Sequence, residues 1–180
     1  MRLITFFVSL FALSLFFSLA LAQESDPLIP LSSPTTISYT LPYPGLLPDH
    51  PLYFLKKIRD TILELLIRSP VKKAEFMLLQ ADKKLNMSIS LMDKQNIRLA
   101  TKTFAESIAH LEEGENALIS VMSASDPSIG PLKDRYVLSI QKHLEVIYAH
   151  VEFVDSDVQS SWRELGTRTQ TLLDNFLSRK

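Results

Sequence analysis

Residues 69–92 read SPVKKAEFMLLQADKKLNMSISLM, and this segment indicates the structural class of the whole chain. It opens with Ser69-Pro70, a capping residue followed by proline at the first helical position, where the missing N–H is tolerated. Its apolar residues then recur mostly at intervals of three and four, the spacing of one helix face. They are Val71, Ala74, Leu78, Ala81, Leu85 and Met92. The segment predicts an amphipathic helix over about 70–93.

Helices are also predicted on both sides of this segment. A helix over about 51–68 precedes it, with Asp49 as the N-cap and Pro51 in the first turn. Its apolar stripe consists of Leu52, Leu55, Ile58, Ile62, Leu65 and Leu66. A helix over about 95–124 follows. Because no strand-like alternation of any length occurs in this part of the chain, the predicted class is all-α.

The C-terminal part of the chain carries one uninterrupted apolar pattern, from Tyr136 to Phe176, without a proline. It predicts a single helix over about 131–178, about 70 Å long, and leaves open whether the helix bends near Asp155-Ser156-Asp157. The predicted fold is an antiparallel four-helix bundle whose last helix protrudes, since its partners are shorter. An exposed apolar stripe of that length is typical of an interface. The predicted contact residues are Val151, Val154, Val158, Trp162, Leu165, Leu172 and Phe176.

The first 22 residues have the pattern of a secretory signal peptide. Arg2 precedes the uncharged run Leu3–Ala22, which ends in Ala20-Leu21-Ala22, the small-residue pattern of a cleavage site. The run is also long enough for an uncleaved membrane anchor. In both cases residues 23–180 are predicted to be extracytoplasmic, either secreted or held at the cell envelope.

Residues 23–48 are predicted to form a Pro-rich linker and an extended arm that lead into a helical domain over 49–180. Their six prolines exclude a helix. The apolar side chains of residues 37–47 should dock part of the arm on the folded domain, with Tyr53 and Phe54 pinning it.

The composition excludes several classes of protein. The 180 residues include no Cys and carry a formal net charge of −1. Disulfides, thiolate metal sites and cysteine nucleophiles are therefore excluded, and nothing in the charge favours nucleic acid.

Charge is nevertheless unevenly spread along the chain. Lys56–Lys102 holds eleven basic and five acidic residues, a sum of +6, whereas Thr103–Leu165 holds four basic and eleven acidic residues, a sum of −7. This favours attraction between basic and acidic helices. The alternative is a basic surface that contacts an anionic membrane or wall polymer.

Three histidines are the candidates for a metal site. His110 lies one turn after Glu106 on one predicted helix, and His143 and His150 share a face of the next. Together they could supply carboxylate and imidazole ligands. The paired Glu-x-x-His motifs of di-iron bundles are absent, so no metal or other cofactor is assigned.

Two further patterns bear on catalysis. Residues 69–72 and 139–142 match the S-x-x-K of penicillin-recognising enzymes, but the companion K-T-G and S-D-N motifs are absent. The acidic run Glu112, Glu113 and Glu115 is predicted to be a solvated helix face. The sequence therefore predicts a protein that is not an enzyme.

Residues 47–60, LPDHPLYFLKKIRD, resemble the opening of a known family. The residues that carry the resemblance are Pro48, Asp49, Pro51, Tyr53 and the lysine pair Lys56-Lys57. The family is a bacterial extracytoplasmic one, numbered 5667 among the domains of unknown function. The resemblance covers roughly residues 44–122 and implies a helical, secreted or membrane-tethered domain without established activity.

The predicted function is a non-enzymatic interaction or scaffold module of the cell envelope. It would bind a protein partner, or self-associate as a coiled coil, through the C-terminal helix. Two alternatives remain open: a metal- or small-ligand-binding bundle that uses His110, His143 and His150, and a periplasmic chaperone-like holdase that offers its apolar helix to unfolded clients.

Overall fold

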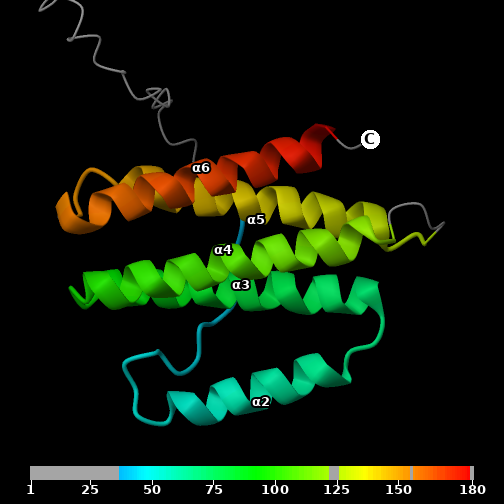
Figure 1. Ribbon diagram of the computed structural model, residues 1–180, viewed down its shortest axis with the longest axis horizontal. Helices are drawn as coiled ribbons and strands as arrows, with labels where there is room; N and C mark the ends of the chain where they lie inside the picture. Colours follow the sequence, from blue (N-terminus) through cyan, green and yellow to red (C-terminus); the bar gives the residue numbers. More distant parts are fainter. Residues whose placement is uncertain (1–36, 122–125, 155, 179–180) are drawn as a thin grey trace, which may run out of the picture. The chain divides into compact units, whose positions relative to one another are not determined.

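The computed structural model describes residues 37–121, 126–154 and 156–178, and within them the chain is all-α, as predicted. The described part forms five helices and no strand (Figure 1). They are α2 (Tyr53–Leu66), α3 (Pro70–Asp93), α4 (Ile97–Ile119), α5 (Ile129–His150) and α6 (Ser156–Ser178). All five belong to one compact unit, residues 33–180. The predicted signal peptide lies outside the described residues.

Helix α3 has the bounds that its sequence predicts. Ser69 is extended, and its Oγ accepts a hydrogen bond from the Lys72 N–H at 3.5 Å. The helix ends in a Schellman motif, in which the N–H groups of Gln95 and Asn96 donate to Met92 O and Leu91 O at 2.8 and 2.9 Å. Gln95 adopts the left-handed conformation, with φ of 59°.

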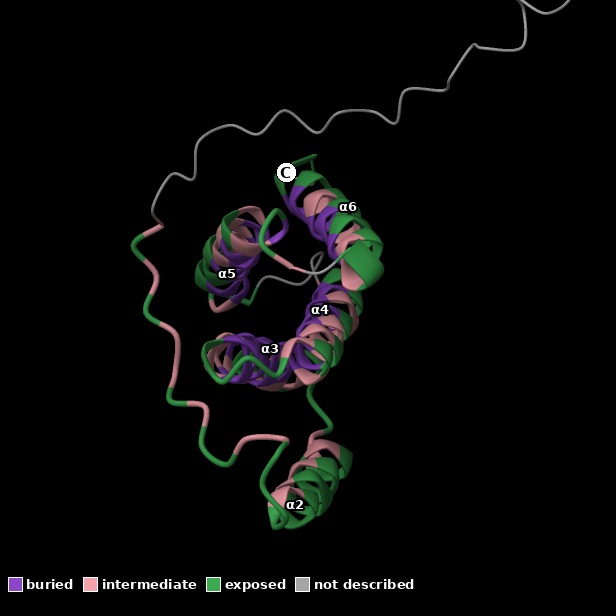
Figure 2. Ribbon diagram, turned by 90° about the vertical axis from the view of Figure 1, so that its left-hand side faces the viewer, coloured by how far each residue is buried: buried purple, intermediate pink, exposed green. Residues whose placement is uncertain are grey.

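The helical core consists of α3, α4, α5 and α6. Within it α3 contacts α4 and α5, and α6 contacts α4 and α5 (Figure 2). Aromatic pairs connect α6 with its two neighbours: Trp162 stacks on Phe104 of α4 with ring centroids 5.2 Å apart, and Phe176 stacks on Tyr136 of α5 at 5.1 Å. Trp162, Tyr136 and Phe104 are fully buried, so these pairs form the centre of the core.

The prediction of one long C-terminal helix over 131–178 is wrong. Helix α5 ends at His150, α6 begins at Ser156, and α6 returns alongside α5 (Figure 1). The Gln159 side chain donates to Val151 O at 3.2 Å across the turn. Folding back buries the apolar stripe of α6 against α4 and α5, which a straight helix could not do.

The predicted exposure of the C-terminal stripe is also wrong. Trp162, Leu165, Leu172, Phe176 and Val151 are buried in the core, and Val154 and Val158 pack against it. The partner interface was predicted because the stripe was expected to be an apolar surface without neighbours. The chain covers the stripe itself, so this reason no longer holds.

The extended arm contacts the helical core through polar groups. The Ile37 N–H donates to Glu145 Oε2 at 2.8 Å, and the Tyr39 hydroxyl donates to Asp82 Oδ2 at 2.6 Å. Further along, Asn86 Nδ2 donates to Pro42 O at 2.9 Å. The arm thus docks on the core: Leu41 packs against it, as the apolar side chains of the arm predict, and these hydrogen bonds, which the apolar pattern does not indicate, add to the contact.

Helix α2 lies outside the helical core (Figure 2). The sequence assigns it to the four-helix bundle, and this assignment is wrong: no residue of α2 is buried. The predicted pinning of the arm by Phe54 is wrong, since Phe54 is exposed and Tyr43 on the arm is 83% exposed, whereas Tyr53 is half-buried.

Candidate contact surface on helix α2

Helix α2 turns its polar side toward the rest of the chain and its apolar side to solvent. Tyr53, Lys56, Asp60 and Glu64, spaced by three and four, are its half-buried positions. The apolar residues on the opposite side are 52–79% exposed. They form the outward face of α2: Phe54, Leu55, Ile58, Ile62, Leu65 and Leu66. At 100° per residue these six positions span a sector of about 120°.

The outward face reverses the sequence-based expectation for this helix. Leu55, Ile58 and Ile62 were predicted to face a core, because a helical apolar stripe usually does. In the structure the same residues are about half exposed. The amphipathic pattern was recognised correctly, but it carries no information on which side of the helix meets the remaining chain.

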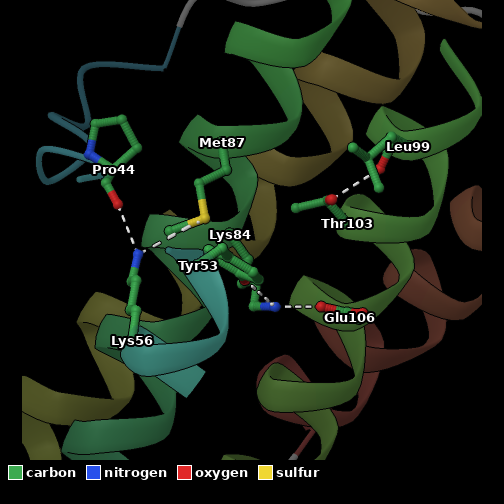
Figure 3. A network of polar contacts seen from close by, with 8 residues as sticks. All are labelled: Pro44, Tyr53, Lys56, Lys84, Met87, Leu99, Thr103 and Glu106. Atoms are coloured by element: carbon green, nitrogen blue, oxygen red, sulfur yellow. Dashed lines mark hydrogen bonds and ion pairs between the residues drawn. The ribbon is translucent and has the colours of Figure 1, made fainter. Parts of the chain in front are cut away.

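Two lysines hold the polar side of α2 in place (Figure 3). Lys56 Nζ donates to Pro44 O at 2.8 Å and lies 3.8 Å from Met87 Sδ. Lys84 Nζ, from α3, donates to Tyr53 Oη at 2.9 Å. Both ammonium groups lie over the Tyr53 ring, at 5.7 and 5.5 Å from its centroid. These contacts fix the rotation of α2 about its axis.

The two lysines differ in their electrostatic surroundings. Burial lowers the pKa of Lys56 to about 8, and the neighbouring lysines Lys83 and Lys84 add to this effect. Burial also acts to lower the pKa of Lys84, but its hydrogen bonds to Glu106 and Tyr53 outweigh burial and raise the pKa. Lys84 therefore remains charged within an ion pair with Glu106 that links α3 to α4.

Positive charge flanks the outward face. Residues 53–72 contain five basic and two acidic residues, a formal charge of +3. Lys57, Arg59, Arg68 and Lys72 are exposed. The two acidic residues each have a basic neighbour: Asp60 pairs with Arg59 at 2.6 Å, and Glu64 lies 3.6 Å from Lys73, which also pairs with Glu113 at 2.6 Å.

A buried polar cluster connects the arm with three core helices. Asp82 accepts hydrogen bonds from the Tyr39 and Ser139 hydroxyls, both at 2.6 Å. His143 Nδ1 lies 2.7 Å from Ser139 O, and His143 Nε2 lies 2.7 Å from Ser107 Oγ. Since a carbonyl only accepts, Nδ1 carries the proton and Ser107 donates to Nε2.

This hydroxyl–imidazole pair does not form a usable nucleophilic site. Ser107 and His143 are both fully buried, so a substrate has no access to them. Burial lowers the pKa of His143 to about 4, which keeps the ring neutral. Burial also raises the pKa of Asp82. The cluster holds the helices in register.

The three candidate metal-binding histidines are not brought together. His143 lies in the buried cluster, His150 Nδ1 contacts Val146 O at 2.8 Å, and His110 is half-buried on α4. Glu106 forms an ion pair with Lys84. The described residues contain no group of three or more His, Asp or Glu side chains placed to hold a metal ion.

The acidic run on α4 is not a solvated face, contrary to the prediction. Glu112 accepts two hydrogen bonds from Arg168 on α6, at 2.9 and 2.7 Å. Glu113 pairs with Lys73 on α3 at 2.6 Å, and Glu115 is buried. The Lys73–Glu113 and Lys84–Glu106 pairs support the predicted attraction between the basic segment 56–102 and the acidic segment 103–165.

The S-x-x-K serines have structural roles. Ser69 caps α3, and Ser139 donates to Asp82 within the buried cluster. Lys142 pairs with Glu145 at 2.7 Å.

A groove of about 470 Å³ lies between α4 and α6. Two of the three basic side chains that line it are already paired within the chain: Arg98 contacts Asp157 at 3.2 Å, and Arg168 contacts Glu112. The groove therefore offers a weaker candidate site than the outward face of α2.

Fold and surface together define an all-α domain that presents an amphipathic helix with its apolar side outward. The family model described as "Domain of unknown function (DUF5667)" matches residues 45–158. The match covers more than half of the chain, so the chain belongs to this family, which confirms the resemblance of the opening segment. Comparisons with curated proteins and with solved structures each found no match.

Proposed function

We propose that this chain is a non-enzymatic interaction module of the cell envelope, and that its contact surface is the outward face of α2. The observation that carries the proposal is the orientation of this helix. Six apolar side chains point to solvent, while Tyr53, Lys56 and Glu64 face the rest of the chain. A contiguous exposed apolar patch of this kind marks an interaction site in soluble proteins.

Energetics support this assignment. Burying a Leu, Ile or Phe side chain completely stabilises by about 1.5–3 kcal/mol, so covering the remaining exposed half of six such residues is worth about 5–9 kcal/mol. A partner can gain this free energy, whereas the isolated chain forgoes it. The polar contacts of Lys56 and Lys84 keep the apolar side available by preventing α2 from rotating inward.

The core would serve as a rigid platform for this surface. We propose that α3, α4, α6 and α5 form an antiparallel four-helix bundle, in which each helix borders two neighbours in that cyclic order. An extracytoplasmic location is supported by the uncharged run Leu3–Ala22 after Arg2. The sealed Ser107–His143 pair supports a non-enzymatic role.

Site-specific photo-crosslinking of the full chain in the envelope of the source cells tests this function. A photoreactive residue at Ile62, on the outward face, is expected to give adducts with protein, lipid or a second copy. The matched control is Arg163, an exposed position on α6 outside the proposed surface. Equal labelling at both positions, or none at either, would contradict the proposal.

A further inference from the structure

We propose that the outward face of α2 binds the surface of an anionic phospholipid bilayer, with the helix lying in the plane of the interface. This inference rests on the proposed function and names its partner. Three features of the described residues favour a lipid surface over a protein groove: the length and sidedness of α2, the position of its charges, and the contacts that orient it.

The dimensions of α2 suit an in-plane helix. It has 14 residues and is therefore about 21 Å long, shorter than the thickness of a hydrocarbon core. None of the helices in the described residues is long and apolar enough to cross a membrane. A helix with one broad apolar side enters the headgroup region with that side down. Ile58 and Ile62 lie along the middle of this side.

The charges are placed for anionic headgroups. Arg59 follows Leu55 by four positions and lies at the margin of the outward face, but its guanidinium is already paired with Asp60. Lys57, Arg68 and Lys72 are exposed near the same helix. Asp60 and Glu64 are on the side that faces the chain, and each has a basic neighbour. A bilayer with anionic lipids is complementary to this arrangement.

The anchoring contacts fix the orientation needed for such binding. Tyr53 and Lys56 are held by Lys84 and Pro44 on the side away from the outward face. Insertion of the apolar side would therefore leave these hydrogen bonds intact. The preceding sequence adds proximity: Leu3–Ala22, whether a signal peptide or an anchor, directs the chain to a membrane.

Vesicle flotation tests the proposal directly. The protein is the chain from Gln23 onward, which contains the whole compact unit of residues 33–180 but lacks the apolar run that would bind vesicles by itself. The probes are vesicles of phosphatidylcholine with and without phosphatidylglycerol, at low ionic strength. We expect flotation with the anionic vesicles and weaker or no flotation with the neutral ones, and added salt should weaken it.

Paired substitutions locate the binding surface. Ile58→Gln with Ile62→Gln is expected to lower the partition coefficient about tenfold or more, because two inserted apolar side chains are lost. The matched control is Ile119→Gln with Leu138→Gln, two exposed apolar residues on α4 and α5. The control should float like the unsubstituted chain. Both variants should keep its melting temperature, since neither pair is buried.

A charge variant tests the preference for anionic lipid separately from the insertion of apolar side chains. Replacing Lys57, Arg68 and Lys72 by Gln should remove the preference for phosphatidylglycerol. In a second readout, Phe54→Trp should be quenched by brominated lipids, whereas the buried Trp162 should not.

Specific outcomes would overturn the inference. They are absence of flotation with anionic vesicles, loss of flotation in the α4–α5 control, or a dimer that dissociates in the Ile58–Ile62 variant. If vesicles do not bind but Ile62 still crosslinks to a protein in the envelope, the lipid partner is wrong and the proposed contact surface stands. If Ile62 gives no adduct in the envelope either, both the lipid partner and the proposed contact surface are wrong.

Discussion

The phenol of Tyr136 occupies the space beside Gly114 in which any larger residue would place its Cβ. A Cβ built on Gly114 would lie 1.7 Å from the Tyr136 hydroxyl oxygen and 2.8 Å from the ring carbon that bears it. Tyr136 is held there because its hydroxyl donates to Ala74 O at 2.7 Å, and its ring stacks on Phe176. Glycine thus lets α4 approach the buried ring of α5, although it weakens the helix by about 1 kcal/mol relative to alanine.

Gly114→Ala should therefore destabilise the protein by about 2–4 kcal/mol, because the buried tyrosine must move or lose its hydrogen bond. Urea unfolding of the chain from Gln23 onward measures this. Gly130→Ala is the matched control: no atom lies within 4 Å of its Cβ position, so its stability should rise slightly or stay the same. Equal stability of the two variants would contradict the packing described for Tyr136.

Gln95→Gly should stabilise the protein by about 0.5–1 kcal/mol. Gln95 has φ of 59°, a conformation that costs free energy in residues with a Cβ and that glycine adopts readily. The hydrogen bonds from its own and the following N–H group close α3 and would be kept. A rise in melting temperature is the expected readout, and Asn96→Gly provides the comparison, since Asn96 has a negative φ of −92°.

Acid should destabilise the fold through His143. Its pKa is lowered from 6.5 to about 4 by burial, so the unfolded chain binds a proton between these values while the native chain does not. Stability is therefore lost as pH falls from about 6.5 to about 4, by about 3 kcal/mol in total. In His143→Gln the free energy of unfolding should depend less on pH in this window.

A second histidine variant isolates this effect. His50→Gln removes an exposed histidine outside the buried cluster and is the matched control. Asp82, whose pKa is raised by burial, lies in the same cluster and acts in the opposite direction, but it is present in both variants. A His143→Gln protein with the full acid dependence would show that another group is responsible.

Alkali should stabilise the attachment of α2 through Lys56. Burial lowers its pKa from 10.5 to about 8, so the unfolded chain holds more protons in that interval and stability rises with pH across it. The free energy of unfolding of Lys56→Met and of the unsubstituted chain should be compared from pH 7 to 10. The difference between the two is expected to grow over this range. Lys57→Met, at an exposed neighbouring position, is the matched control.

Much of the helical structure could be predicted from local signals. Ser69-Pro70 and the apolar spacing after it predict α3 over 70–93, which are its observed bounds. The family was recognised from Pro48, Asp49, Pro51 and Tyr53, and the match confirms it. These features depend on residues within one or two helical turns, which is the range over which capping and periodicity act.

The break between α5 and α6 could not be placed from periodicity. Residues 150–156 contain neither glycine nor proline, and the apolar spacing continues across them. The residues Asp155-Ser156-Asp157 were a weak signal, since Asp and Ser favour turns and helix starts. The reversal is favoured because it brings Trp162 onto Phe104 and Phe176 onto Tyr136, contacts between residues far apart in the chain.

The exposure of the outward face of α2 likewise depended on contacts between residues far apart in the chain. Helical periodicity established the class of the chain and the amphipathic character of 53–66, because side-chain spacing along a helix is a local property. Which side of α2 faces solvent was fixed by the tertiary structure, through Lys84 on α3 and Pro44 on the arm. An apolar stripe indicates that burial is favourable, but which surface covers it depends on residues that folding brings near. For α2 the proposed covering surface lies outside the chain.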